Sequence, residues 1–381
     1  MKNKQGFFLL VLGLFLFFVN GDNYAASALL IRMSTDFGTN ISSAALTVVS
    51  YMLCFGLFTI FFGPLGDRYG KTWILKIATF GSAAASLLSA VSPNLSAAII
   101  FRAINGIFSS GVMPVTVAFI GEISSPETRH PRIAKAMGWM FLGSALATVI
   151  GGSISQYGSW RHVYLAYGVA ESLLFIPLFF ALPKSSAAKG PSPLLAPYRE
   201  LISISGFVKT IGLLFFIGFS NLGVFSYLGQ FIEERLDLNL ILIGLVLSSY
   251  GLGALTAGRF AGKIRNKTGK LFFPMFGIAG GLGFVAFTFA EISTFFAVLG
   301  LFISGFSFIC LQSSIIAAAQ EMAPFKRGAV MSAASFTMVT SAAAGTFING
   351  LIYKGNPALV LYLAAGAPAL AGLLAKANIK D

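Results

Sequence analysis

Charged residues are scarce in this chain. Only 10% of the 381 residues are Asp, Glu, Lys or Arg, against about 25% in a typical soluble domain, and 56% are hydrophobic. The mean hydropathy is +0.83. This composition excludes an ordinary water-soluble globular protein and indicates a chain whose main solvent is the lipid bilayer.

Cysteine and histidine are also nearly absent, with two of each. Cys54 and Cys310 lie inside apolar runs without metal-ligand spacing, so we interpret them as packing residues. The sequence contains neither a phosphate-binding P-loop nor a nucleophile with a base at a recognisable spacing. We therefore expect no metal, no cofactor and no enzymatic activity.

The net charge of +13 does not indicate nucleic-acid binding, because the basic residues are scattered over short loops. Long apolar runs separate these loops, and a helix needs roughly 20 apolar residues to cross a bilayer. The runs predict twelve spans: 7–30, 42–65, 72–91, 95–121, 136–156, 161–182, 206–230, 239–262, 271–290, 294–319, 329–350 and 357–375.

With these spans, 18 of the 26 Lys and Arg residues lie on the side of the amino terminus. Such a bias predicts that both termini are cytoplasmic. The first residues resemble a secretory signal, with Lys2 and Lys4 before an apolar run. Apolar residues resume directly after Asp22, however, and we expect one long helix there.

The two halves of the chain repeat each other. The segment Gly63–Lys71 (GPLGDRYGK) returns as Gly262–Lys270 (GKIRNKTGK), 199 residues later. Residues 126–129 (PETR) return as residues 324–327 (PFKR) at an offset of 198. Internal repeats are common in secondary transporters. We predict six-helix bundles at 1–182 and 206–381, joined by a cytoplasmic linker at 183–205.

The loop Gly63–Lys71 resembles the signature between the second and third helices of the major facilitator superfamily. The resemblance covers essentially the whole chain. It implies an all-α membrane protein with about twelve transmembrane helices in two pseudo-symmetric bundles, and transport by alternating access. In the family this loop forms a cytoplasmic latch, which here corresponds to Gly63, Asp67, Arg68, Gly70, Lys71 and Glu122. Asn266 replaces the acid in the second copy, so that latch should be weaker.

Asp22, Arg102 and Glu171 lie well inside predicted spans, where charge is costly and commonly functional. Arg102 shares a helical face with Asn105, Ser109 and Thr116. Asp22 is its natural partner, because both lie in the outer half of the membrane. At 100° per residue Asp22 points away from Asn20, Asn23 and Tyr24, and so could face a neighbouring helix.

In the drug and proton antiporters that the chain resembles, an acid of the first helix titrates and a fourth-helix arginine tunes it. Asp22 and Arg102 are thus candidates for proton coupling. Glu171 is the rival acid, with Tyr164 and Tyr167 on its face. It either carries the proton or stays protonated as a hydrogen-bonding group.

The resemblance places the first, fourth, seventh and tenth helices around a central cavity. The candidate cavity residues are Asn20, Asn23, Tyr24, Asn105, Ser109, Phe216, Phe219, Tyr227, Gln230, Phe308 and Gln312. Aromatic stripes also serve ordinary packing. An aromatic cavity with few charges suits an amphiphilic or hydrophobic solute better than a polyanion.

Gly143, Gly151 and Gly152 partly match the family's antiporter signature in the fifth helix, although Thr148 stands at the proline position. The alternative is ordinary packing of small residues. Together these features predict a proton-coupled exporter of small amphiphilic molecules, monomeric and multi-pass in the cytoplasmic or inner membrane. The alternative is proton-coupled uptake of a small metabolite, because the loop signature does not set direction.

Overall fold

The computed structural model describes residues 2–185 and 195–379, and these residues form helices and connecting turns without a strand. The first half comprises α1 (Lys2–Asp36), α2 (Ile41–Ala44), α3 (Leu46–Tyr69), α4 (Lys71–Ala90), α5 (Leu95–Ile123), α6 (Pro126–Tyr157) and α7 (Trp160–Ala181). Part of the predicted linker, residues 186–194, lies outside the described residues. Its last part contains a short helix, α8 (Ala196–Ser203).

The second half comprises α9 (Phe207–Ile217), the π-helical η1 (Gly218–Leu222), α10 (Gly223–Leu236), α11 (Leu240–Thr268), η2 (Gly269–Leu271), α12 (Phe272–Thr288), α13 (Thr294–Met322), η3 (Pro324–Lys326), α14 (Arg327–Tyr353) and α15 (Pro357–Asn378). Eleven segments of the described chain are long and apolar enough to span a membrane, and one of them, Leu240–Thr288, contains both α11 and α12. The predicted all-α membrane fold with about twelve spans is confirmed.

Several helices extend beyond the apolar runs that predicted them. The clearest case is α6, which begins at Pro126 instead of residue 136. Proline is favoured in the first turn of a helix, because the first N–H groups have no partner within the helix. Polar residues can continue a helix outside the lipid, and hydropathy does not detect that part.

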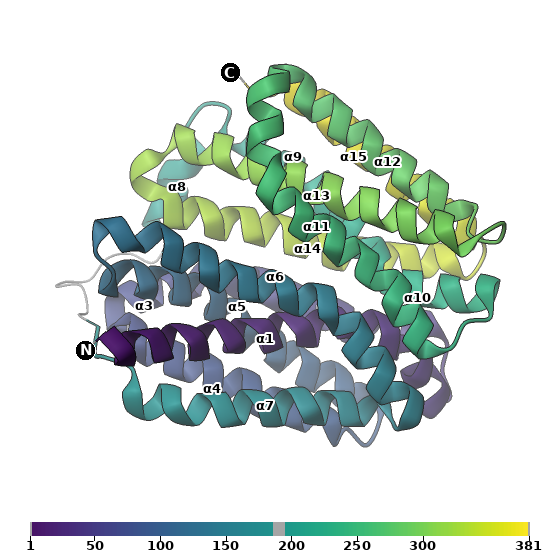
Figure 1. The fold of residues 1–381 in the computed structure, drawn as a ribbon, viewed down its shortest axis with the longest axis horizontal. Helices are drawn as coiled ribbons and strands as arrows, with labels where there is room; N and C mark the ends of the chain where they lie inside the picture. Colours follow the sequence, from purple (N-terminus) through teal and green to yellow (C-terminus); the bar gives the residue numbers. More distant parts are fainter. Residues whose placement is uncertain (1, 186–194, 380–381) are drawn as a thin grey trace.

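The chain enters and leaves the bundle at the same end, called the termini end below (Figure 1). At the opposite end, six helices begin after an Asn or Ser whose side chain accepts a hydrogen bond from a backbone N–H of the first turn. Such caps satisfy donors that a helix cannot pair itself. The capping residues are Asn40, Asn94, Ser159, Asn239, Ser293 and Asn356.

The internal repeat is visible in the backbone. Gly70 and Gly269, at equivalent places in the two copies of the loop, both have positive φ, of 90° and 52°. Glycine adopts this conformation without the strain that other residues incur. Gly106 packs against the carbonyl of Tyr51, and Gly305 packs in the same way against the carbonyl of Tyr250. Both residues of the second contact follow those of the first by 199 positions in the sequence.

The two halves lie side by side, α1–α7 in the lower part of Figure 1 and α9–α15 in the upper part. They meet mainly through α6 against α11 and α3 against α14. At the opposite end the contacts are close: the Ser42 hydroxyl donates to the carbonyl of Gly350 at 2.7 Å. The backbone N–H of Leu240 donates to Gln156 Oε1 at 3.0 Å. The halves are therefore joined at the opposite end.

Candidate functional site

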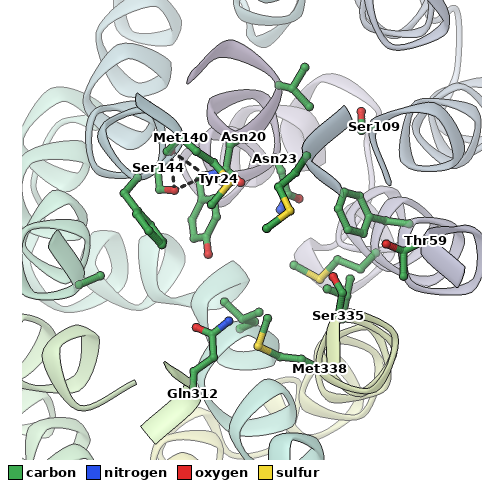
Figure 2. Close-up of a pocket in the computed structure, with 18 of the residues that line it drawn as sticks. Asn20, Asn23, Tyr24, Thr59, Ser109, Met140, Ser144, Gln312, Ser335 and Met338 are labelled. Carbon is green, nitrogen blue, oxygen red and sulfur yellow. Dashed lines mark hydrogen bonds between the residues drawn. The ribbon is translucent and has the colours of Figure 1, made fainter. Parts of the chain in front are cut away.

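A cavity of about 190 Å³ lies between the two halves. Its walls come from α1, α3, α5 and α6 of the first half and from η1, α10, α11, α13 and α14 of the second. Figure 2 shows Asn20, Asn23 and Tyr24 on one side of the space and Gln312 and Met338 on the other. The site is thus formed jointly by both halves.

Three amide side chains, those of Asn20, Asn23 and Gln312, line the cavity. The Nδ2 of Asn20 donates to the carbonyl of Met140 at 3.0 Å and also contacts the Ser144 hydroxyl. Asn23 differs, since its buried Oδ1 has no hydrogen-bond partner among the described residues. Gln312 reaches the cavity from α13. Asn23 and Gln312 can therefore offer amide groups to a ligand from opposite halves.

Six of the eleven predicted cavity residues line this space. They are Asn20, Asn23, Tyr24, Ser109, Phe308 and Gln312. A seventh, Asn105, lies directly behind the wall, where its Oδ1 accepts a hydrogen bond from the Ser109 hydroxyl at 2.9 Å. Residues of α1, α5 and α13 thus line this cavity or lie directly behind its wall.

The structure does not bring the predicted face of the seventh span to the cavity. Tyr227 donates to the carbonyl of Thr346 at 2.8 Å and stacks on Tyr353 of α14. The Gln230 amide donates to Glu234 at 2.8 Å. Phe216 packs against the core, and Phe219 stacks on Phe215. Leu222 and Phe225 line the cavity in their place.

The π-helical turn η1 explains this difference. A π-turn closes i→i+5 hydrogen bonds and is wider than an α-turn. Residues before and after Gly218–Leu222 therefore do not share the face that a uniform helix of 100° per residue would give them. Gly218 packs against the Met338 carbonyl, which directs this side of the helix toward α14.

The sequence did not reveal that methionines line the cavity, nor that α3, α6, α11 and α14 contribute to its wall. Met52, Met113, Met140, Met331 and Met338 all line the cavity. They come from α3, α5, α6 and α14. Their flexible, polarisable thioethers adapt to irregular ligands. A methionine in an apolar helix looks the same in sequence whether it faces lipid, core or cavity.

Asp22 and Arg102 form the expected contact. Arg102 Nη1 lies 3.0 Å from Oδ1 and 2.9 Å from Oδ2 of Asp22, and each side chain is only 1% exposed. The guanidinium also lies over the rings of Tyr51 and Tyr164, 4.5 and 4.8 Å from their centroids. Asp22 points away from the cavity, as its helical phase predicts, and toward α4 and α5.

A chain of hydrogen bonds leads from this ion pair to Glu171. Asn105 Nδ2 donates to Asp22 Oδ2 at 3.1 Å, and Ser109 donates to the Asn105 Oδ1. The hydroxyls of Ser109 and Ser82 lie 3.1 Å apart, and Ser82 donates to Glu171 Oε2 at 2.9 Å. Glu171 is fully buried, and its Oε1 has no partner among the described residues.

The hydrogen-bonded chain touches the cavity at one point. Ser109 belongs both to the cavity wall and to the link between the two acids. Its single hydroxyl proton can go to Asn105 or toward Ser82, but not to both. A ligand that hydrogen-bonds Ser109 would therefore change which partners remain for the acids.

The signature loop forms an ion cluster at the termini end. Lys71 Nζ lies 3.2 Å from Asp67 and 3.1 Å from Glu122, which ends α5. Asp67 is 64% exposed and Arg68 lies over the ring of Tyr69. Gly63 faces Ser332 of α14, whose hydroxyl would lie 3.8 Å from an added Cβ.

The three glycines singled out in α6, Gly143, Gly151 and Gly152, are points of close helix contact. A side chain at Gly143 would collide with the carbonyl of Phe17 in α1. Gly151 packs against Ala25 of α1, and Gly152 packs against the carbonyl of Leu240 in α11. These glycines let α6 lie close to α1 in its own half and to α11 in the other half.

The Major Facilitator Superfamily family model matches residues 10–375, nearly the whole chain. The chain belongs to the major facilitator superfamily. It is 24% identical over 349 residues to the uncharacterised MFS-type transporter YceJ of Bacillus subtilis (strain 168). This match covers 90% of this chain and 88% of that protein. It is also 29% identical over 154 residues to the MFS antiporter QDR3 of Candida albicans, covering 39% of this chain and 22% of that protein.

Among solved structures, a D-xylose-proton symporter superposes with a TM-score of 0.79 at 15% identity, covering 98% of this chain and 97% of that chain. This likeness establishes the fold. As a member of the major facilitator superfamily, the protein is a multi-pass membrane protein and a secondary transporter of a small molecule.

Proposed function

We propose that this major facilitator protein exports small amphiphilic or hydrophobic organic molecules in exchange for protons. The observation that carries the proposal is the buried pair of Asp22 and Arg102, which is hydrogen-bonded through Asn105 to the cavity residue Ser109. Buried ionisable residues in membrane helices commonly mark ion pathways. The largely apolar cavity beside them suits an amphiphilic ligand.

Coupling follows from competition for the same hydrogen-bonding groups. Protonation of Asp22 would remove the charge that holds Arg102, and Arg102 Nε and Nη2 have no partner among the described residues. Glu171 is the second candidate for the proton. The amide of Asn105 interrupts the series of hydroxyls, so the chain would transmit a change of hydrogen bonding and not conduct a proton directly.

Transport would proceed by rocking of residues 1–182 against residues 206–381. The cavity is closed at the opposite end by contacts between α6 and α11 and between Ser42 and Gly350. Both termini would be cytoplasmic in a cytoplasmic or inner membrane, as the distribution of Lys and Arg favours. With cytoplasmic termini, the cavity in this structure would be closed on the external side of the membrane. We expect the protein to work as a monomer.

The latch residues Asp67, Lys71 and Glu122 form an ion cluster that connects the loop after α3 to the end of α5. All three belong to the first half, so rocking of the halves would leave this cluster intact in both states. It would hold the loop within residues 1–182, while Gly63 of the same loop faces Ser332 of α14 in the other half.

Proton release upon ligand binding tests the proposal. Detergent-purified protein is mixed with neutral drugs, lipophilic cations and small metabolites in weak buffer, and the pH change is recorded. We expect release from the wild type and its loss in either Asp22→Asn or Glu171→Gln. Asp36→Asn is the matched control on α1, because Asp36 pairs with Arg161 at the opposite end. Ligand binding without proton release in any form would reject coupling through these acids.

Uptake by symport is the second candidate function, because one solved structure of the same fold is a D-xylose-proton symporter. Inverted membrane vesicles separate the two directions. External substrate should make the lumen of vesicles more alkaline if the protein is an antiporter. A symporter would instead make the lumen more acidic.

A further inference from the structure

The cavity wall is uncharged. None of the lining residues that the structure describes is Asp, Glu, Lys, Arg or His. The ionisable residues behind the wall do not reach it, since Asp22, Arg102 and Glu171 are at most 1% exposed. A charged ligand would lose its hydration here without gaining a counter-charge, which disfavours its binding.

The wall also carries side chains that can pack against an aromatic ring of a ligand. Tyr24, Phe225, Tyr250 and Phe308 form a continuous aromatic series, with centroid separations of 5.6, 5.2 and 6.0 Å. The five methionines complete the apolar surface. Thioethers and aromatic edges both make favourable contacts with aromatic rings.

The cavity volume matches a small ring. An engineered cavity of about 150 Å³ in another protein holds benzene, and the volume here is about 190 Å³. One ring with a small substituent therefore fits this space. Among the polar groups of the wall, the amides of Asn23 and Gln312 lie on opposite sides of the space, and Asn23 Oδ1 has no hydrogen-bond partner among the described residues.

We propose that the ligand of this cavity is an uncharged, one-ring molecule whose single polar substituent is bound by the amides of Asn23 and Gln312. The proposal rests on the proposed function only in treating the cavity as the substrate site. It excludes lipophilic cations and carboxylates as preferred ligands.

Three probes of nearly equal shape test the charge preference. Phenylacetamide is neutral, phenylacetate is its anionic counterpart and phenylacetamidine its cationic counterpart. Binding to the detergent-purified full chain is measured by titration calorimetry and by the thermal shift of unfolding. We expect phenylacetamide to bind about tenfold more tightly than either charged probe. Equal or tighter binding of a charged probe, or no binding of phenylacetamide at millimolar concentration, would overturn the proposal.

Gln312→Glu places a carboxylate at the cavity and should shift the preference toward phenylacetamidine by about tenfold or more. Gln320→Glu is the matched control, because Gln320 lies on the same helix, α13, but outside the cavity wall. An unchanged preference in Gln312→Glu would place the ligand elsewhere. If Gln312→Glu does not fold, Gln312→Leu should weaken phenylacetamide binding about fivefold or more through the lost amide contact.

These measurements involve neither a gradient nor transport. Failure of proton release together with selective phenylacetamide binding would reject the coupling mechanism and retain the neutral-ligand site. Proton release upon binding of phenylacetamidine, with no preference for phenylacetamide, would retain the coupling mechanism and reject the neutral-ligand site.

Discussion

Asp22 and Arg102 are almost completely enclosed, and each satisfies the charge of the other. Two further donors and two ring faces hold the pair: Ser86 donates to Asp22 Oδ2 at 2.9 Å, Asn105 donates to the same oxygen, and Tyr51 and Tyr164 flank the guanidinium. Removing one charge leaves the other buried and unpaired, which is costly. The pair is therefore a structural element as well as a candidate proton site.

The two charges should show a strong energetic coupling. Asp22→Asn alone should lower the stability by about 3–5 kcal/mol, because Arg102 keeps its charge without a partner. The double variant Asp22→Asn/Arg102→Gln should regain a large part of this loss. Thermal unfolding in detergent of the two single variants and the double variant gives the coupling energy. Losses that simply add would mean that the pair has no such coupling.

At the level of single elements, α6 depends on its glycines. Gly143→Ala should push α6 away from the Phe17 carbonyl of α1 and destabilise the protein by about 1–3 kcal/mol. Gly138→Ala is the matched control on the same helix, because nothing lies within 4 Å of an added Cβ there. Alanine also favours the helix over glycine, so this control should not lose stability. Unfolding temperatures of the two variants provide the comparison; equal values would contradict close packing at Gly143.

The linker helix α8 connects the two halves at the termini end. The Tyr198 hydroxyl donates to the carbonyl of Ile60 in α3 at 2.8 Å. That carbonyl lacks its usual partner four positions later in the helix, because Pro64 has no N–H. Glu200 of α8 forms an ion pair with Lys326 of η3. Rocking of the halves changes the separation between α3 and η3, so it should break at least one of these bonds.

Tyr198→Phe should therefore favour the alternative state. Loss of one hydrogen bond worth about 1 kcal/mol corresponds to a population shift of about fivefold. Spin labels at Tyr157→Cys and Ile292→Cys, which are exposed positions of the two halves at the opposite end, report opening there by their distance distribution.

Cys54→Ser and Cys310→Ala remove the two native thiols first. Tyr362→Phe, on an exposed part of α15, serves as the control for loss of a hydroxyl. An identical distance distribution in Tyr198→Phe and wild type would show that α8 does not bias the states.

The sequence predicted where the helices lie better than it predicted which side of each helix faces the cavity. Spans could be predicted because hydropathy is a local property, and the orientation of Asp22 followed from the regular period of α1. The cavity face of the seventh span could not be predicted, because the π-turn Gly218–Leu222 changes the helical phase. The link from Glu171 to Ser82 and Ser109 joins three helices, so it depends on packing that no single helix encodes.

At the scale of the whole molecule, the neutral ligand and the proton together determine how transport responds to voltage. Exchange of one uncharged molecule for one proton moves one net charge across the membrane in each cycle. Moving that charge across a membrane potential of 100 mV changes the free energy by about 2.3 kcal/mol. This free energy corresponds to a substrate concentration ratio of about fiftyfold across the membrane. Liposomes containing the protein, at equal pH inside and outside, should thus transport phenylacetamide when a potassium gradient with valinomycin sets a potential.

The sign of this response separates the mechanisms. An exporter driven by proton entry should move the ligand away from the compartment that is negative, and a symporter should move it into that compartment. Either Asp22→Asn or Glu171→Gln should abolish both responses, because the variant that lacks the proton-carrying acid can no longer bind the proton. If the wild type equilibrates the ligand at the same rate with and without a potential, transport carries no net charge, and either the proton or the neutrality of the ligand must be abandoned.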